Sequence, residues 1–362
     1  MTRPLVAQVD LAALKANVAR VRQYAPAAKV MAVVKANAYG HHLERVLPAL
    51  DDADGLALLE LDAALGLRRR GEARPLVLLE GCFDARELPE VAAGGIDTVV
   101  HSPWQLAMLR EARLARRIGV HVKVNTGMNR LGFAPAEVHG VCDELAKLPG
   151  VEIRTVMTHF ARADEDGALE APLARFAAAC RGLAWPRSLA NSAGTVRYAE
   201  VGGEWVRPGI MLYGATPFAG RSAASLGLVP AMTLRSRLIA VQSLAAGESV
   251  GYGAMFTARA PARIGIVACG YADGYPRHAP NGTPVLVCGR RARTAGRVSM
   301  DMLAVDLAGI PEADVGSDVV LWGGGLPVDE VAVAAGTVGY ELLCAVAPRV
   351  AFETVAAAAA HA

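Results

Sequence analysis

Short apolar runs alternate with amphipathic stretches from residue 29 to about residue 213. Between the runs lie Ala-, Leu- and Arg-rich segments such as LDAALGLRRRG, in which apolar residues recur three or four positions apart, as on one face of a helix. Eight near-continuous apolar strands, each followed by a helix-length crossover, favour a parallel sheet closed into a (β/α)8 TIM barrel. An open doubly wound sheet is the alternative, but it does not require eight strands. The eight runs begin at Lys29, Asp54, Pro75, Ile96, Val120, Val151, Arg187 and Trp205.

A change of pattern after about residue 222 indicates a second domain. Strand-like segments such as MTLRSRLIAVQSL, ARIGIVACGY, TPVLVCG and DVVLWG now follow one another without helices between them. The residues that separate them, as in ADGYP and PNGTP, are typical of turns. We therefore predict an α/β fold in two parts: a barrel over residues 1–222, whose opening stretch of about ten residues can pack with the second domain, and a mainly β domain over residues 223–362.

Composition and charge exclude several classes of protein. The chain has 37 Lys and Arg against 35 Asp and Glu, a formal net charge of +2. This balance gives no electrostatic case for nucleic-acid binding, which needs a concentrated basic face. Hydrophobic residues make up 53% of the chain, enough for a large core. Apolar runs stop short of the roughly 18 residues that a membrane span needs, so we expect no membrane segment.

The spacing of the cysteines indicates the cellular compartment in which the protein works. Because none of the six forms a CxxC pair, buried thiols in a reducing compartment are favoured over a disulfide framework or a zinc site. The opening MTRPLVAQVD shows no signal peptide. We therefore expect a cytoplasmic protein that binds no metal.

The segment VMAVVKANAYGHH places a lysine, Lys35, at the end of the first apolar strand. In barrel enzymes this end of a strand carries the chemistry. One interpretation is a strand-end lysine that reaches solvent. The other is a desolvated amine that forms a Schiff base or acts as a base. We expect His41 and His42, which follow in the same segment, to lie on the surface and not to bind a metal.

A second cluster lies where the barrel closes. The segment NSAGT puts Ser192 at the end of strand seven, and VRPGIMLYG puts Arg207, Gly209 and Ile210 in strand eight. The loops after these two strands are the recurrent phosphate site of this architecture. NSAGT alone could be an ordinary helix cap. A lysine from strand one together with a phosphate site from strands seven and eight indicates pyridoxal 5′-phosphate.

These residues, with others along the chain, resemble the alanine racemase family of bacteria. The segments that carry the resemblance, in order, are AVVKANAYGHH, KVNTGMNRLGF, THFARAD, NSAGT, RPGIMLYG, GYGAMF, GYADGYPR and GRVSMDM. They cover essentially the whole chain. The resemblance implies a pyridoxal-phosphate isomerase that interconverts L- and D-alanine, and that supplies D-alanine for peptidoglycan or removes it in catabolism.

The resemblance also implies two catalytic bases. Lys35 binds the cofactor covalently and works on the D-face of the substrate, and Tyr252 works on the L-face. A free phenol titrates near pH 10, so such a base needs cationic or hydrogen-bonding neighbours. Arg130 and His159 match the positions that supply them. In the family the tyrosine enters the site of the other subunit, so the resemblance implies a homodimer with composite active sites.

Two further cationic residues have matched roles. Arg207 matches the arginine that faces the pyridine nitrogen of the cofactor, and a guanidinium does not give up its proton to that nitrogen. Lys123 matches a lysine that the family carries as a carbamate, which holds Arg130 in place. An unmodified Lys123 paired with a nearby carboxylate is the alternative.

Four more residues complete the expected site. Met300 matches a contribution from the partner subunit to the pocket for the substrate carboxylate. Tyr271 matches a residue at the entrance that excludes bulky side chains. Tyr39 and Tyr340 match hydroxyls at the phosphate site.

Three other functions remain open on the sequence. A broad-specificity amino-acid racemase would use the same residues. A fold-related decarboxylase is disfavoured by Arg207 and Tyr252. A non-catalytic protein that carries pyridoxal phosphate would not need the second domain, which contains the second candidate base.

Overall fold

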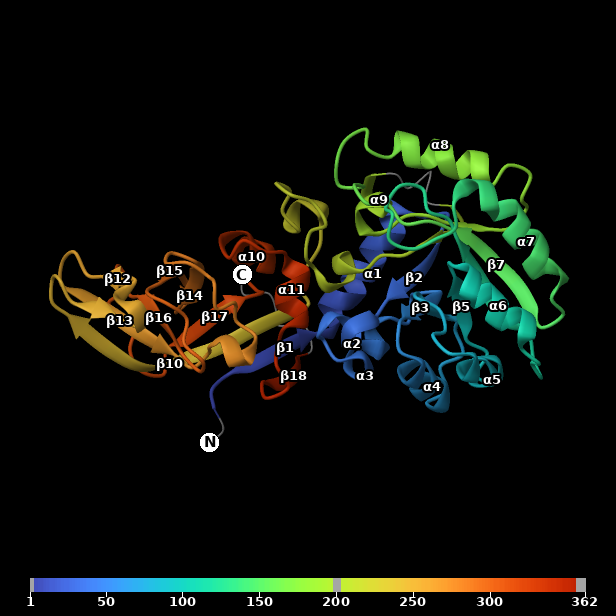
Figure 1. The fold of residues 1–362 in the computed structure, drawn as a ribbon. Coiled ribbons are helices and arrows are strands. Elements are labelled where there is room, and N and C mark those ends of the chain that lie inside the picture. Colours follow the sequence, from blue (N-terminus) through green and yellow to red (C-terminus); the bar gives the residue numbers. More distant parts are fainter. Residues whose placement is uncertain (1–2, 198–202, 356–362) are drawn as a thin grey trace.

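The computed structural model describes residues 3–197 and 203–355, which form two lobes (Figure 1). One lobe is a closed barrel of eight parallel strands in sequential order. The predicted (β/α)8 barrel is thereby confirmed. Its strands are β2 (Lys29–Val33), β3 (Gly55–Leu58), β4 (Leu76–Leu78), β5 (Asp97–Val100), β6 (Ile118–Lys123), β7 (Val151–Met157), β8 (Arg187–Ser188) and β9 (Trp205–Val206).

Amphipathic helices surround the barrel. The first, α1 (Leu11–Tyr24), begins at Asp10, whose carboxylate accepts hydrogen bonds from the N–H groups of Ala12 and Ala13. Its buried residues recur three and four positions apart, the period that the sequence shows. The others are α3 (Leu43–Val46), α4 (Leu61–Arg69), α5 (Leu88–Ala93), α6 (Pro103–Glu111), α7 (Val138–Lys147), α8 (Glu170–Ala179) and α9 (Ser192–Arg197). Within residues 3–197 and 203–355, none of the helices has the length and hydropathy needed to cross a bilayer.

The last two barrel strands are shorter than the sequence pattern predicts. Strand β9 ends at Val206, so Arg207 and Gly209 follow the strand and do not lie in it, and Ile210 begins a 3₁₀ helix, η5 (Ile210–Tyr213). Pro208 is the physical reason, because it has no N–H to continue the ladder and its φ is fixed. Similarly, Ser192 is the first residue of α9 and not the end of β8.

The second lobe is built on one eight-stranded sheet in the order β13-β16-β15-β14-β17-β10-β1-β18, with β13 also paired to β10. The first strand of the chain, β1, pairs antiparallel with β10 and parallel with β18, so both ends of the described chain lie in this sheet. The strands are β1 (Val6–Asp10), β10 (Met232–Leu244), β13 (Ala262–Val267), β14 (Pro284–Val287), β15 (Arg290–Thr294), β16 (Leu303–Asp306), β17 (Asp318–Trp322) and β18 (Ala351–Val355).

A hairpin and two short helices complete this lobe. The hairpin of β11 (Ser249–Val250) and β12 (Phe256–Thr257) lies outside the main sheet. The helices are α10 (Val328–Ala334) and α11 (Gly339–Cys344), and α11 packs against α2 (Lys35–Tyr39) of the barrel. Helix α11 therefore joins the second lobe to the end of the first barrel strand (Figure 1).

Candidate active site

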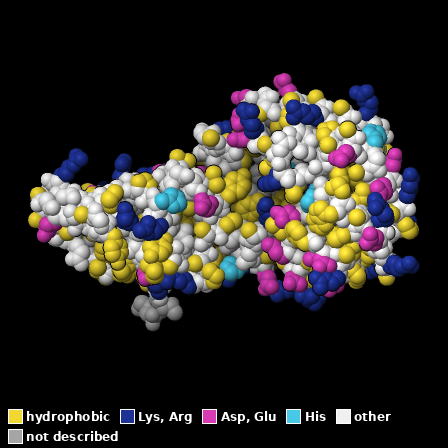
Figure 2. Space-filling view, in the orientation of Figure 1, with side chains coloured by type: hydrophobic (Ala, Val, Ile, Leu, Met, Phe, Trp, Pro, Cys, Tyr) yellow, Lys and Arg dark blue, Asp and Glu magenta, His cyan; other side chains and the backbone are white. Residues whose placement is uncertain are grey.

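A cavity of about 850 Å³ opens at the C-terminal ends of the barrel strands, beside α11 of the second lobe. Figure 2 shows the surface hollowed between the two lobes, with hydrophobic side chains gathered beside the hollow. Catalytic sites of barrel enzymes lie at this end of the strands. Most of the residues singled out from the sequence line the cavity: Lys35, Tyr39, Lys123, Arg130, His159, Ser192, Arg207, Gly209, Ile210 and Tyr340.

Lys35 begins a left-handed turn, α2, that follows the first barrel strand. Residues 36–39 all have φ between 51° and 57°, although none is glycine. This conformation costs about 1–2 kcal/mol per residue and persists only where the surroundings fix it. Here the Asn37 carboxamide oxygen accepts from the Leu43 N–H at 2.8 Å, and Gly40 packs directly against α11. The turn therefore determines the position of Lys35 at the end of the first barrel strand.

Tyr39, at the end of this turn, is held between two other tyrosines. Its ring stacks on Tyr213 with the centroids 4.7 Å apart, and the Tyr340 ring lies 6.0 Å away on α11. Burial raises the pKa of both Tyr39 and Tyr340. Both phenols are therefore protonated at neutral pH and can donate hydrogen bonds.

His41 is fully buried, so its expected surface position is wrong. Its Nδ1 lies 2.9 Å from the Tyr39 carbonyl oxygen, and because a carbonyl can only accept, this nitrogen carries the proton. Burial lowers the pKa of His41 to about 4, so the ring is neutral at pH 7. The left-handed turn, which the sequence does not reveal, carries the chain back against Tyr213. His42 is partly exposed.

One end of the cavity has the groups that hold an anion. The Gly209 N–H donates to the Ser192 Oγ at 2.9 Å, and both residues are buried. A Cβ atom at Gly209 would lie 2.4 Å from the Tyr39 hydroxyl, so only glycine leaves room for this approach. Ile210 and Tyr340 line the same cavity. Hydroxyls and backbone N–H groups in a concave site suit a phosphate.

Arg207 is a buried cation. Its guanidinium donates to the Ser188 Oγ at 2.6 Å and to the Thr158 carbonyl oxygen at 2.5 Å. In the part of the chain that the structure describes, no carboxylate lies within salt-bridge distance of it. Burial lowers the pKa of Arg207 to about 10, so the side chain stays protonated at neutral pH. Its charge is therefore available to a bound group.

Lys123 ends β6 and lies in the same cationic environment. Burial, followed by the charges of Arg207 and Arg130, lowers the pKa of Lys123 to about 8. Burial and the same cations hold the pKa of His159 well below its ordinary value, so the imidazole is neutral. The cavity therefore favours negative charge in whatever binds there.

The loop that carries Arg130 is fixed by Asn125. The carboxamide oxygen of Asn125 accepts from the N–H groups of Gly127 at 3.1 Å and Asn129 at 3.0 Å. Phe133 then returns the chain to β6, where its N–H donates to the Lys123 carbonyl oxygen at 2.8 Å. This loop holds Arg130 over the end of β6.

Three predicted site residues lie outside the cavity. Tyr252 is at the tip of the β11–β12 hairpin, at the end of the second lobe away from the barrel (Figure 1), and is 71% exposed. Met300 is 52% exposed and Tyr271 is 37% exposed, both on the second lobe. The single chain therefore does not bring these three residues to its own cavity.

Sequence reasoning missed several polar residues of the cavity, among them Glu80 and His101. Glu80 follows β4 and His101 follows β5 directly, and the His101 Nε2 lies 3.0 Å from the Glu80 carbonyl oxygen. The Glu80 carboxylate partly offsets the effect of the cations on the pKa of Lys123. The rule that barrel chemistry lies at the ends of strands could have identified both residues.

Comparison with known proteins relates both lobes to one family. Residues 9–217 match the sequence model of the alanine racemase N-terminal domain, and residues 231–354 match that of the C-terminal domain. The chain is 56% identical to alanine racemase of Nitrosospira multiformis over 352 residues, which cover 96% of this chain and 99% of the relative. It is 53% identical to a catabolic alanine racemase of Salmonella typhimurium over 98% of this chain and all of the relative.

Comparison with solved structures points to the same family. Biosynthetic alanine racemase from Pseudomonas aeruginosa superposes with a TM-score of 0.95 at 50% identity, covering 98% of this chain and 100% of that chain. Alanine racemase from Acinetobacter baumannii superposes with a TM-score of 0.92 at 38% identity over the same shares. Both lobes thus match one kind of enzyme, and the chain belongs to the alanine racemase family, whose members depend on pyridoxal 5′-phosphate.

Proposed function

We propose that the chain racemises alanine with two bases that come from two copies of the chain. Lys35 acts on the D-face, and Tyr252 of the second copy acts on the L-face. The observation that carries this proposal is the composition of the cavity, where a strand-end lysine shares about 850 Å³ with an anion site and a buried arginine. Family membership supports the reaction, and the cavity supports the role of Lys35.

The residues present fit pyridoxal phosphate. Ser192, Tyr39, Tyr340 and the backbone of Gly209 and Ile210 would hold the phosphate, and the missing Cβ at Gly209 keeps the space beside the Tyr39 hydroxyl open. Lys35 would bind the cofactor covalently, with the neutral His159 beside it in the cavity. When bound, the cofactor withdraws electron density from the α-carbon of the amino acid and so acidifies its α-proton.

Arg207 would limit side reactions. Its guanidinium keeps its proton and would donate a hydrogen bond to the ring nitrogen without protonating it. By keeping its proton, Arg207 would favour return of the proton to the substrate over transamination. The pair of hydrogen bonds to Ser188 and Thr158 fixes the orientation of the guanidinium.

A second copy would complete the site. The exposed Tyr252 hydroxyl would hold the L-face proton, Met300 would line the pocket for the substrate carboxylate, and Tyr271 would narrow the entrance. Arg130 of the first copy would bind the substrate. The exposure of these three second-lobe residues, and the position of the β11–β12 hairpin at the end of the second lobe away from the barrel, support a homodimer with composite sites.

Lys123 would carry a carbamate. With its pKa lowered to about 8, a fraction of its amine is neutral at pH 7 and can attack carbon dioxide, releasing one proton as the N–C bond forms. The resulting anion would hold Arg130. Incubation with ¹³C-bicarbonate should give a carbamate resonance in the ¹³C NMR spectrum, and this resonance should be missing from Lys123→Ala.

The two enantiomers have equal free energy in water, so the reaction runs in whichever direction consumption draws it. The same chain could thus supply D-alanine for peptidoglycan or return D-alanine to catabolism, in the cytoplasm where alanine is available. The similarity to both a catabolic and a biosynthetic alanine racemase supports this breadth.

The test is conversion of L-alanine in D₂O, followed by chiral chromatography and mass spectrometry. We expect D-alanine that carries one deuterium at the α-carbon. Faster conversion of serine or lysine than of alanine would indicate a broad-specificity racemase, and release of carbon dioxide would indicate a decarboxylase. Cofactor absorbance without turnover of any amino acid would indicate a carrier and overturn the proposal.

A further inference from the structure

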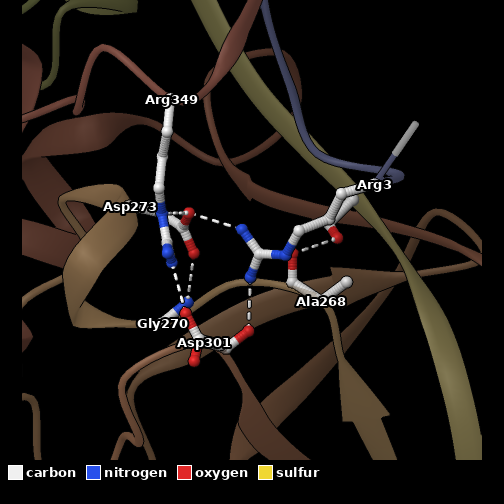
Figure 3. Close-up of polar contacts among 7 residues, drawn as sticks. Arg3, Ala268, Gly270, Asp273, Asp301 and Arg349 are labelled. Carbon is white, nitrogen blue, oxygen red and sulfur yellow. Dashed lines mark hydrogen bonds and ion pairs between the residues drawn. The ribbon is translucent and has the colours of Figure 1, made fainter.

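A cluster of two arginines and two aspartates lies in the second lobe, outside the barrel cavity (Figure 3). At its centre Asp273, the last residue of η8 (Tyr271–Asp273), has a fully buried side chain. Its Oδ1 accepts from Arg3 at 2.5 Å and from Arg349 at 2.7 Å, and its Oδ2 accepts from the Gly270 N–H at 2.8 Å. One carboxylate therefore joins three separate parts of the chain.

Each arginine of the cluster also reaches Asp301. Arg349 donates to the Asp301 carboxylate at 2.6 Å, and Arg3 donates to the Asp301 carbonyl oxygen. A guanidinium has several donors in a rigid fork, which lets one side chain bind two segments at once. Since two positive and two negative charges are present, the cluster is neutral as a whole.

The two segments that the cluster joins carry exposed residues. Tyr271 stands two positions before Asp273, and Met300 stands directly before Asp301. The backbones of these segments also touch: the Tyr271 N–H donates to the Ser299 carbonyl oxygen at 3.0 Å. Arg3 and Arg349 come from the chain just before β1 and β18, which are parallel neighbours in the sheet. Through its hydrogen bonds, the cluster thus links the two surface segments that contain Tyr271 and Met300 to the edge of the sheet beside the barrel.

The cluster is also linked to the barrel cavity of its own chain. The Ala347 N–H, just after α11, donates to the Asp273 carbonyl oxygen at 3.1 Å. A Cβ atom at Gly274 would lie 2.2 Å from the Ala345 carbonyl oxygen, so the backbones are in close contact. Helix α11 supplies Tyr340 to the cavity.

We propose that Asp273, clamped by Arg3 and Arg349, is a positioning residue that sets substrate size selection by fixing Tyr271 and Met300. This inference rests on the proposed function, in which those two residues enter the site of the second copy. Asp273 touches no substrate. It acts by holding the two segments at a constant separation, so that the entrance admits alanine and excludes larger side chains.

The test compares Arg3→Ala with Arg235→Ala in the holoenzyme. The two arginine side chains are similarly exposed, at 36% and 37%, but Arg235 contacts Gln8 and Asp318 and neither of the two segments. For Arg3→Ala we expect the KM for L-alanine to rise about fivefold and the preference for alanine over serine to fall by a similar factor, because the segments loosen. The kcat for alanine and the cofactor absorbance should stay unchanged, as in Arg235→Ala.

Two further variants keep the test decisive. Arg3→Lys, which keeps one charged contact, should restore part of the preference for alanine over serine. Adding Arg3→Ala to Asp273→Asn should change the KM for L-alanine little, because both substitutions act through the same carboxylate. If Asp273→Asn does not fold, the Arg3 variants alone decide. Unchanged KM and preference in Arg3→Ala, or equal losses in Arg235→Ala, would overturn the inference. Failure of the wild type to racemise alanine would instead refute the proposed function.

Discussion

At the scale of single residues, the cavity combines four cationic side chains with the carboxylates of Glu80 and Asp164. This excess of positive charge suits an anionic cofactor and the carboxylate of a substrate, and it adds to the effect of burial in keeping His159 neutral. Burial strengthens both effects, because the charges are poorly screened away from water. The cations are Lys35, Lys123, Arg130 and Arg207.

Replacing Tyr252 with Phe should remove the L-face base and leave the cofactor in place. We expect deuterium exchange into L-alanine to fall by at least about 100-fold, the usual contribution of a general base. Exchange at D-alanine, which depends on Lys35, should fall much less. Mass spectrometry of each enantiomer after incubation in D₂O measures both. If Tyr252→Phe exchanged deuterium into L-alanine as fast as the wild type does, the assigned role would be contradicted.

Replacing Arg207 with Glu should increase transamination. A carboxylate next to the ring nitrogen favours its protonated form by about 1–3 pKa units, so we expect roughly tenfold more pyruvate per turnover. Pyruvate can be followed with lactate dehydrogenase and NADH. Arg207→Lys, which keeps the charge, is the matched control, and equal pyruvate from both variants would refute this role of Arg207.

At the scale of elements, periodicity predicted the alternation of strands and helices but not the backbone that positions the site. The eight apolar runs do become the barrel strands. The pattern could not show that Pro208 ends β9 early, because apolar residues continue beyond it. Nor could it show the left-handed turn at residues 36–39, since alanine and asparagine there are ordinary helix-compatible residues. The left-handed turn comes from tertiary contacts, which local patterns do not contain, whereas Pro208 is a local signal that the apolar run obscures.

The contact between α2 and α11 can be tested at Gly40. This residue has φ +78°, and a Cβ atom there would lie 2.1 Å from the Leu343 carbonyl oxygen. We expect Gly40→Ala to lower the free energy of unfolding by more than about 2 kcal/mol. Gly95, with φ +58° and open space around it, is the control, where alanine should cost about 1 kcal/mol. Urea denaturation measures both, and equal losses would show that the contact with α11 is unimportant.

At the scale of the whole molecule, the cavity lies at the end of the barrel beside α11, whereas the exposed Tyr252 belongs to the β11–β12 hairpin, which lies at the far end of the second lobe (Figure 1). Sequence motifs identified the residues at both places, because each motif is local. Which residues meet depends on how two chains associate, and neither spacing nor hydrophobic pattern encodes that. Within one chain, β1 and β18 bring both ends of the described chain into the second sheet.

The central claim, that each active site takes Lys35 from one chain and Tyr252 from the other, is tested most directly with hybrid dimers. Co-expressed Lys35→Ala and Tyr252→Phe chains with different tags are purified by two affinity steps, and alanine racemisation is measured. Each homodimer should be inactive. The hybrid of a Lys35→Ala chain and a Tyr252→Phe chain should show about half of the wild-type activity, because one of its two sites has both bases.

The control hybrid pairs a wild-type chain with a chain that carries both substitutions. Composite sites predict almost no activity for this control, because each site lacks one base, and about half of the wild-type activity for the first hybrid. The reverse result, an inactive first hybrid and a half-active control, would place both bases in one chain and contradict the account.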